Sequence, residues 1–290
     1  MRTLLFPTDF SASSNHAAEY GFNMAAQIRA NIILFNAVII PAEAPQAGLV
    51  VWPMEESDVF FKDSTDELKR MQSHIEHLEN SFSFKPTVRC LNETGKLTDA
   101  ANNIIKREHV DLVVMSTHVT GALTSLLLGN HSRNMIDGIN KPLLLVPPAA
   151  QIAPIKKIAF ATDFKNIEED FASVYELISF ARLMNAEIWI THIYNKEAHT
   201  AEFRIWIQQF MTDISGKANY PYIHYRLFEN PTIELGLEWL CEHEQIDILA
   251  MAHRSHTFID SLFRRSQTQK MVGHIPIPLL VFPATLQPNL

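Results

Sequence analysis

Short apolar runs alternate with amphipathic stretches along the whole chain. In the first half these runs predict strands at Leu4–Phe6, Ile32–Val38, Thr87–Leu91, Leu112–Met115 and Leu143–Val146. The stretches between them carry apolar residues three or four positions apart, the spacing of one helix face, as in Leu68, Met71, Ile75, Leu78 and Phe82. Runs such as LVVM and LLLV are continuously apolar, which is typical of strands covered on both faces. The pattern therefore predicts an α/β fold with a doubly wound, five-stranded parallel sheet.

The second half repeats this pattern with the same landmarks in the same order. The tripeptide TDF at 8–10 returns at 162–164, and the segments DLVVMSTH and KPLLLVP return as DILAMAHR and IPLLVFP. The first copy is longer, and residues 41–58, rich in Pro, Ala and Glu, are predicted to be an inserted surface loop. Such a duplication indicates two copies of one fold.

A proline-rich segment separates the two copies. The three prolines of VPPAAQIAPIKK rule out a continuous helix or a central strand there. We therefore expect two tandem domains, residues 1–148 and 155–290, with a linker at 148–155.

Composition narrows the range of partners and compartments. The 24 basic and 32 acidic residues give a formal net charge of -8, so no long-range field attracts nucleic acid or an anionic membrane. The chain start, MRTLLFPTDF, reaches polar residues too early for a signal peptide, and no apolar run is long enough for a membrane span. The two cysteines, Cys90 and Cys241, lie in different halves, which fits a reducing compartment. We expect a cytoplasmic protein.

Four segments of the first half carry a family resemblance. They are PTDFS at 7–11, VDLVVMSTH at 110–118, LLLGNHS at 126–132 and KPLLLVP at 141–147. Their order and spacing, repeated in the second half, resemble the universal stress protein family over nearly the whole chain. The resemblance implies a Rossmann-like fold of the adenine-nucleotide alpha-hydrolase type in each half.

The resemblance also predicts how the two halves assemble. Members of the family pair their sheets through the closing strand, so Leu143–Val146 and Leu279–Phe282 are expected to meet across a pseudo-two-fold axis. The tandem chain would then be an internal dimer, because fusion supplies the second copy at high effective concentration. Further association into a homodimer stays open.

Nucleotide-binding members of the family carry GxxG, nine residues, then Gly and Ser or Thr, after the fourth strand. Glycines let backbone N–H groups approach phosphate oxygens, and the helix that follows favours negative charge at its start. The first copy has Ser116 and Val119 at the leading glycine positions and ends in Gly129 and Asn130. Only one motif glycine is left, so the loop is expected to have changed shape.

The second copy has lost all of these glycines. It carries Ala252 and Ser255 at the leading positions and Arg265 and Ser266 at the end. With Arg254 nearby, guanidinium groups could replace backbone amides in holding an anion, and a solvated or interdomain set of charges is the alternative.

Other positions of the family site persist in both halves. The resemblance implies that Asp9 and Asp163 contact a nucleoside, although both could instead cap the helix that follows. It places one residue of each second strand at the base and one hydroxyl of each half at the phosphate. The candidate cofactor-binding residues are Asp9, Ala37, Met115, Ser116, Val119, Gly129, Asn130, Ser132, Asp163, Ile193, Arg254, Ser255, Arg265, Ser266 and Thr268.

Three functions stay open at this point. The favoured one is a stress-response regulatory or interaction protein with degenerate nucleotide-binding motifs and at most one small-ligand cleft. The alternatives are an ATP- or AMP-binding protein that uses Asp9, Gly129 and Ser132, and a weak ATPase. No Walker loop, nucleophile elbow or zincin helix occurs, so neither a catalytic set nor a metal site is predicted.

Overall fold

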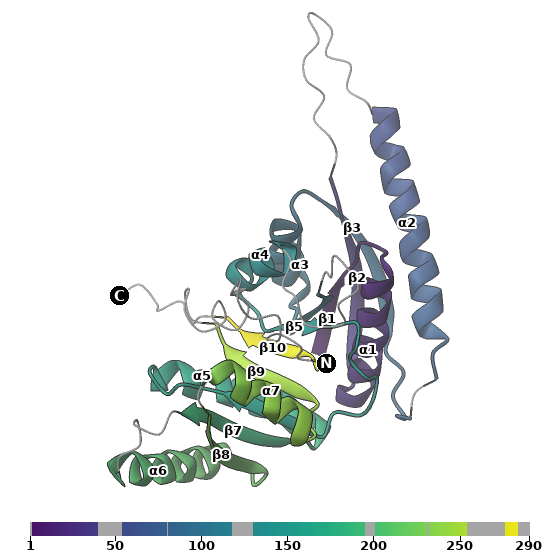
Figure 1. Ribbon diagram of the computed structural model, residues 1–290. Coiled ribbons are helices and arrows are strands. Elements are labelled where there is room, and N and C mark those ends of the chain that lie inside the picture. Colours follow the sequence, from purple (N-terminus) through teal and green to yellow (C-terminus); the bar gives the residue numbers. More distant parts are fainter. Residues whose placement is uncertain are drawn as a thin grey trace, which may run out of the picture.

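The computed structural model describes residues 2–39, 54–79, 81–117, 130–194, 201–230, 232–253 and 276–283. Ten strands form one sheet (Figure 1). Their bounds are β1 Arg2–Pro7, β2 Ala30–Val38, β3 Val88–Thr94, β4 Leu112–Ser116, β5 Leu143–Val146, β6 Lys157–Ala161, β7 Glu187–Tyr194, β8 Ile223–Glu229, β9 Ile248–Ala252 and β10 Leu279–Phe282.

The two halves of the sheet have one topology. The strand order is β3-β2-β1-β4-β5-β10-β9-β6-β7-β8, so each half runs third, second, first, fourth, fifth from its outer edge to the centre. Within each half, every pair of neighbouring strands is parallel. The predicted fold of two doubly wound, five-stranded units is confirmed.

The two closing strands join the halves. β5 and β10 pair antiparallel, with Leu144 opposite Leu280 and Leu145 opposite Leu279. All four residues of each strand are buried, because helices cover both faces of the sheet at this point. The predicted pairing of the closing strands is therefore confirmed, and one continuous sheet crosses the whole chain.

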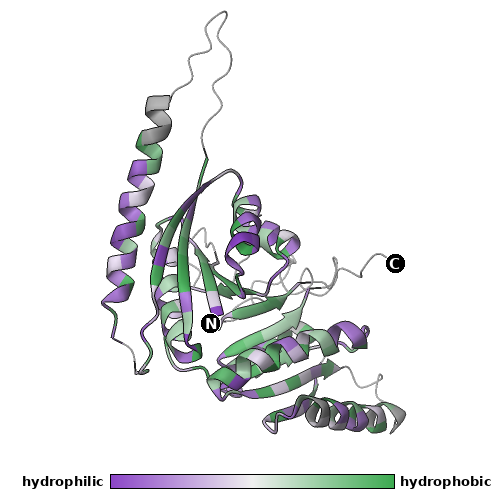
Figure 2. Cartoon of the chain, turned by 180° about the vertical axis from the view of Figure 1, so that it is seen from behind, coloured by the Kyte–Doolittle hydropathy of each residue, from purple (hydrophilic) through white to green (hydrophobic). Residues whose placement is uncertain are grey.

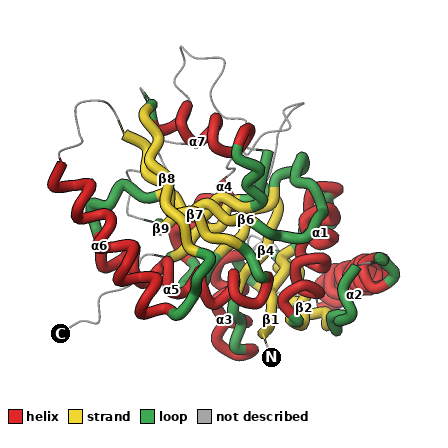
Figure 3. The backbone as a smooth tube through the Cα atoms, turned by 90° about the horizontal axis from the view of Figure 1, so that it is seen from below, coloured by secondary structure: helices red, strands yellow, loops and turns green. Residues whose placement is uncertain are grey.

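Seven described helices lie on the two faces of this sheet (Figure 3). α1, α2, α5 and α6 pack on one face, where Leu4 and Phe6 of β1 point, and α3, α4 and α7 pack on the other, where Leu5 points. The apolar residues of each face form one cluster that includes both halves. The helix bounds are α1 Ala12–Ile28, α2 Met54–Glu76, α3 Leu97–Glu108, α4 Asn130–Gly138, α5 Ile167–Met184, α6 Ala201–Ala218 and α7 Ile233–His243.

The predicted surface loop at 41–58 extends too far, because its last residues belong to a helix. Residues 40–53 lie outside the described part, and α2 already begins at Met54. The apolar stripe marks only the turns that pack on the sheet, whereas α2 extends beyond it, with Val59 and Phe60 exposed (Figures 1 and 2). The spacing of apolar residues predicts only those helical turns that bury one face, so it does not predict exposed turns.

The proline-rich segment between the halves is held against α1. Ala150 and Ile155 are buried, and the Gln27 side chain both donates to the Ile155 carbonyl (2.8 Å) and accepts from its N–H (2.9 Å). The segment is therefore packed between the halves. Among the described residues, no helix has the length and apolar character needed to cross a membrane.

Candidate functional site

The same turn follows the first strand of each half. After β1, the Thr8 hydroxyl accepts a hydrogen bond from the Phe10 N–H (3.0 Å), and after β6, the Thr162 hydroxyl accepts one from the Phe164 N–H (2.9 Å). Phe10 and Phe164 both have positive φ, 63° and 55°. This reversal places the aspartate between threonine and phenylalanine at the carboxyl end of the sheet, where ligands bind in such folds.

Asp9 belongs to a chain of hydroxyl groups that reaches the fourth strand. One of its carboxylate oxygens accepts hydrogen bonds from the Ser11 N–H (3.1 Å) and the Ser14 hydroxyl. The Ser14 oxygen lies 3.3 Å from that of Ser116 in β4. Ser11, rather than Asp9, accepts the hydrogen bond that caps α1. The Ser11 N–H and the Ser14 hydroxyl thus orient the carboxylate, while Asp9 stays exposed to solvent.

A cleft of about 590 Å³ opens beside this carboxylate. Its floor comes from the ends of β1, β2 and β4, and its walls from the first turn of α3 and from α4. Five predicted site residues line it together, namely Asp9, Ala37, Met115, Ser116 and Ser132. The volume is in the range of pockets that hold small molecules.

The buried hydroxyl of Ser132 indicates that the cleft suits a polar ligand. The side chain is fully buried, yet its hydroxyl has no hydrogen-bond partner among the described residues. The Thr117 hydroxyl, at the end of β4, is in the same situation. Buried hydroxyl groups normally have partners, and of these two residues Ser132 lines the cleft, so its hydroxyl is suited to a group that enters there.

In the second half, the described residues leave little space at the corresponding place. A cavity of only about 10 Å³ is left beside Asp163. Ile193, at the end of β7, packs so closely on α7 that a Cβ added to Gly236 would lie 2.7 Å from its side chain. Leu237 of α7 is buried beside it.

A small residue keeps this space open in the first half. By its position at the end of the second strand, Ala37 corresponds to Ile193. Asp163 also differs from Asp9. The Lys165 ammonium lies 3.4 Å from the Asp163 carboxylate, and the Asp163 side chain is 17% exposed. A ligand-sized space beside the aspartate is therefore found in one half only, within the described residues.

Comparison with known proteins agrees with this architecture. The universal stress protein family matches residues 1–147, which is half of the chain. The chain belongs to the universal stress protein family. A curated universal stress protein of Methanocaldococcus jannaschii is 26% identical over 155 residues, which cover 50% of this chain and 94% of that protein.

Solved structures extend the likeness in fold to the whole tandem. A universal stress protein from Archaeoglobus fulgidus aligns over 97% of this chain and 98% of its own, with a TM-score of 0.68 and 17% identity. A functionally unknown protein from Pseudomonas aeruginosa aligns over 98% of this chain and 93% of its own, with a TM-score of 0.57 and 11% identity. Both likenesses concern the fold.

The remaining predicted positions of this universal stress protein fall into two groups. Asn130 is the first residue of α4 and does not line the cleft. The others lie outside the described residues: Val119, Gly129, Arg254, Ser255, Arg265, Ser266 and Thr268.

The cleft also contains residues that the sequence argument missed. Lys96, Thr98 and Asp99 reach it from the start of α3, and His131 and Asp137 from α4. No family motif covers the start of α3. The signal was the polar first turn of a helix that follows a strand, at the edge of the sheet where a ligand is expected.

The two thiols are not reactive groups of this site. Burial raises the pKa of Cys90 to about 11 and that of Cys241 to about 12, so both stay protonated at neutral pH. Within the described part of the chain, no group of three or more metal-ligating side chains comes together. His74 of α2 pairs with Glu19 of α1 at 2.7 Å.

Proposed function

We propose that this universal stress protein is a stress-response regulatory protein with one cleft for an adenine nucleotide, in its first half. The second half acts as a permanent structural partner that completes the sheet. The reducing compartment suggested by the thiols supports action in the cytoplasm.

One observation carries the proposal: among the described residues, the place beside the aspartate holds about 590 Å³ in the first half and about 10 Å³ in the second. Both halves keep the strand, the turn and the aspartate. What differs is the residue at the end of the second strand, Ala37 or Ile193, and the helix surface that faces it. The asymmetry supports one ligand per chain.

The lining of the cleft supports a nucleoside with an anionic end. Asp9 supplies a carboxylate for ribose hydroxyl groups, while Ala37 and Met115 supply apolar surface for a base. Ser132 lies in the first turn of α4, where the helix dipole favours negative charge, and has an unused hydroxyl. These residues fit a nucleotide with its phosphate directed towards α4.

Isothermal titration with ATP, AMP and adenosine tests this function. We expect binding at one site per chain, weakened roughly tenfold or more by Asp9→Ala, because a charged acceptor for the ligand is lost. Asp163→Ala is the matched control and should leave the affinity unchanged. Two sites per chain, or equal effects of the two variants, would contradict the proposal.

A second variant copies the closed half into the open one. Ala37→Ile places the side chain of Ile193 at the end of β2, so the base should be excluded while the fold is kept. Loss of binding with an unchanged circular dichroism spectrum is the expected result. Full affinity in this variant would show that the ligand binds elsewhere.

Loss of the leading glycines at Ser116 and Val119 supports the interaction protein as a second candidate. Mass spectrometry of small molecules released from the purified chain separates the two, because the interaction protein carries none. Phosphate release in the presence of Mg²⁺ tests the weak ATPase.

A further inference from the structure

A histidine of the second half reaches a helix of the first half. His253 follows β9, and its Nε2 atom lies 3.2 Å from a carboxylate oxygen of Asp137 in α4. The backbone N–H of His253 donates to the Phe282 carbonyl of β10 (2.7 Å), which fixes the chain at this point. The side chain of His253 is 15% exposed and that of Asp137 is 61% exposed. A largely buried imidazole therefore meets an open carboxylate across the boundary between the halves.

Asp137 stands at the end of α4 that disfavours a carboxylate. It is the last residue but one of the helix, where the dipole places negative charge, and no basic residue of α4 lies in this last turn. Among the described residues, the ring of His253 has no other polar partner, because its Nδ1 atom is buried and unbonded. The second half thus supplies the group that compensates this charge of the first half.

The carboxylate of Asp137 belongs to the cleft beside Asp9, which it lines from α4. The proposed phosphate is directed towards Ser132 in the same helix, five residues before Asp137, which is a rise of about 7.5 Å. This distance is within the screening length of about 8–10 Å at moderate salt. A carboxylate without a partner at this wall would therefore oppose a phosphate group.

The first half holds α4 in place by contacts of its own. The Asn102 side chain of α3 donates to the Gly138 carbonyl at 2.8 Å. Thr98 packs so closely there that a Cβ added to Gly138 would lie 2.5 Å from its Cγ2 atom. Loss of His253 should therefore leave the shape of the cleft in place while it removes the partner of Asp137.

We propose that His253 of the second half gives the cleft of the first half its preference for phosphorylated ligands, because it compensates the charge of Asp137. The inference rests on the proposed function and deepens it, since the second half then contributes to the ligand site as well as to the sheet. The ligand class is a nucleoside phosphate, and His253 acts through Asp137 as a positioning residue. Its effect should grow with the negative charge of the ligand.

Isothermal titration of the full chain with adenosine, AMP and ATP, without added metal, tests this role. His253→Ala should leave the affinity for adenosine unchanged and weaken AMP about threefold, as expected for one charge acting at this range. ATP should lose more than AMP, because its charge is larger. A merely structural role of His253 would instead lower the affinity for all three ligands alike.

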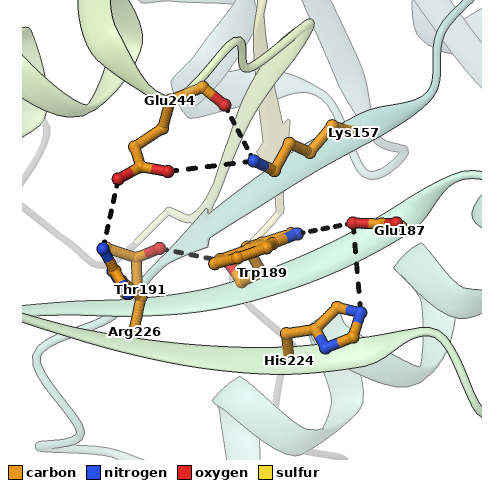
Figure 4. Close-up of polar contacts among 7 residues, drawn as sticks. All are labelled: Lys157, Glu187, Trp189, Thr191, His224, Arg226 and Glu244. Atoms are coloured by element: carbon orange, nitrogen blue, oxygen red, sulfur yellow. Dashed lines mark hydrogen bonds and ion pairs between the residues drawn. The ribbon is translucent and has the colours of Figure 1, made fainter.

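His224→Ala is the matched control. His224 lies 3.9 Å from the Glu187 carboxylate, in a polar network of the second half (Figure 4). Its strand, β8, is at the opposite end of the strand order from the first half. The control therefore also removes an imidazole from a carboxylate, but far from the cleft, and the affinities for all three ligands should stay unchanged.

A double-mutant cycle assigns the effect to the pair. Asp137→Asn removes the charge, so in this background His253→Ala should no longer weaken AMP or ATP. A loss that persists beside Asp137→Asn, or one of equal size for adenosine, would overturn the inference while the proposed function stands. If the unmodified chain binds none of the three ligands, the proposed function fails and the inference fails with it.

Discussion

At the scale of single residues, the duplication shows which atoms the fold needs and which it leaves free. The carbonyl of the turn threonine is held in both halves by a side chain of the second strand. In the first half Asn36 donates to the Thr8 carbonyl (2.7 Å), and in the second His192 donates through Nδ1 to the Thr162 carbonyl (2.8 Å). The required feature is a donor at this place, which an amide or an imidazole supplies.

The imidazole gives the second half a dependence on pH. Burial lowers the pKa of His192, and the Thr162 carbonyl and nearby carboxylates oppose this in part. A histidine with a lowered pKa binds fewer protons in the folded chain, so the free energy of unfolding falls as pH drops through the unfolded value of 6.5 and levels off below the folded pKa.

His192→Asn should remove part of this pH dependence, because asparagine serves the same carbonyl in the first half. Urea unfolding at pH 7.5 and at pH 5 measures the change. We expect a smaller loss of stability on acidification in the variant than in the unmodified chain. Identical losses in the two proteins would show that His192 does not carry the effect.

At the scale of elements, three helices end in the same way without glycine. Arg29 after α1, His109 after α3 and Asn185 after α5 have φ values of 56°, 51° and 52°, and the N–H of each closes the last turn of its helix. The left-handed conformation is costly for residues with a Cβ, least so for asparagine. The chain therefore stores strain at two of these caps.

Arg29→Gly should stabilise the protein by about 0.5–1 kcal/mol, because glycine adopts the left-handed conformation without steric cost. Arg29 is exposed, so little packing is lost. Asn185→Gly is the matched control, with an expected gain of less than half as much. Chemical unfolding measures both, and a loss of stability in Arg29→Gly would contradict this view of the cap.

At the scale of the whole molecule, the two halves form one folding unit. Each face of the sheet has a single apolar cluster with residues of both halves. Arg2 of the first half donates to Ser179 of the second (3.0 Å), and its guanidinium lies 4.3 Å from the ring centroid of Phe180. We therefore expect cooperative unfolding in one transition.

Gln27 is the residue whose loss should disturb this coupling. Its side chain bonds both backbone groups of Ile155 and lies 3.3 Å from the Met184 carbonyl. Gln27→Ala should cost about 2–3 kcal/mol, because these partly buried groups lose their partner. It should also shift the transition seen by tryptophan fluorescence away from that seen by circular dichroism, since three of the four tryptophans lie in the second half.

Gln72→Ala provides the control for this experiment. Gln72 makes its bonds to Glu76 and to the Val88 carbonyl within the first half. Its loss should lower stability while the two probes still report one transition. Separate transitions in the Gln72 variant, or coincident ones in the Gln27 variant, would contradict the assigned role of Gln27.

The sequence by itself determined the class of fold, the duplication and the order of elements. Continuous apolar runs require strands buried on both faces, and this requirement holds wherever the strands finally lie. Asp9 and Asp163 were identified from the repeated TDF tripeptide and the family resemblance, and the hydrogen bond from the phenylalanine N–H to the threonine hydroxyl in each turn joins residues two positions apart. The start of α2 was missed because Val59 and Phe60, near its N-terminal end, are exposed and do not belong to the apolar stripe.

Only the tertiary structure decided which half keeps an open cleft. The aspartates are alike in sequence, but the space beside them depends on Ile193 meeting Gly236 and Leu237, which are distant along the chain. The same holds for Lys96 and His131, which reach the cleft of Asp9 from two separate helices. Local patterns determine what each segment becomes, whereas volume and contact are properties of neighbours in space.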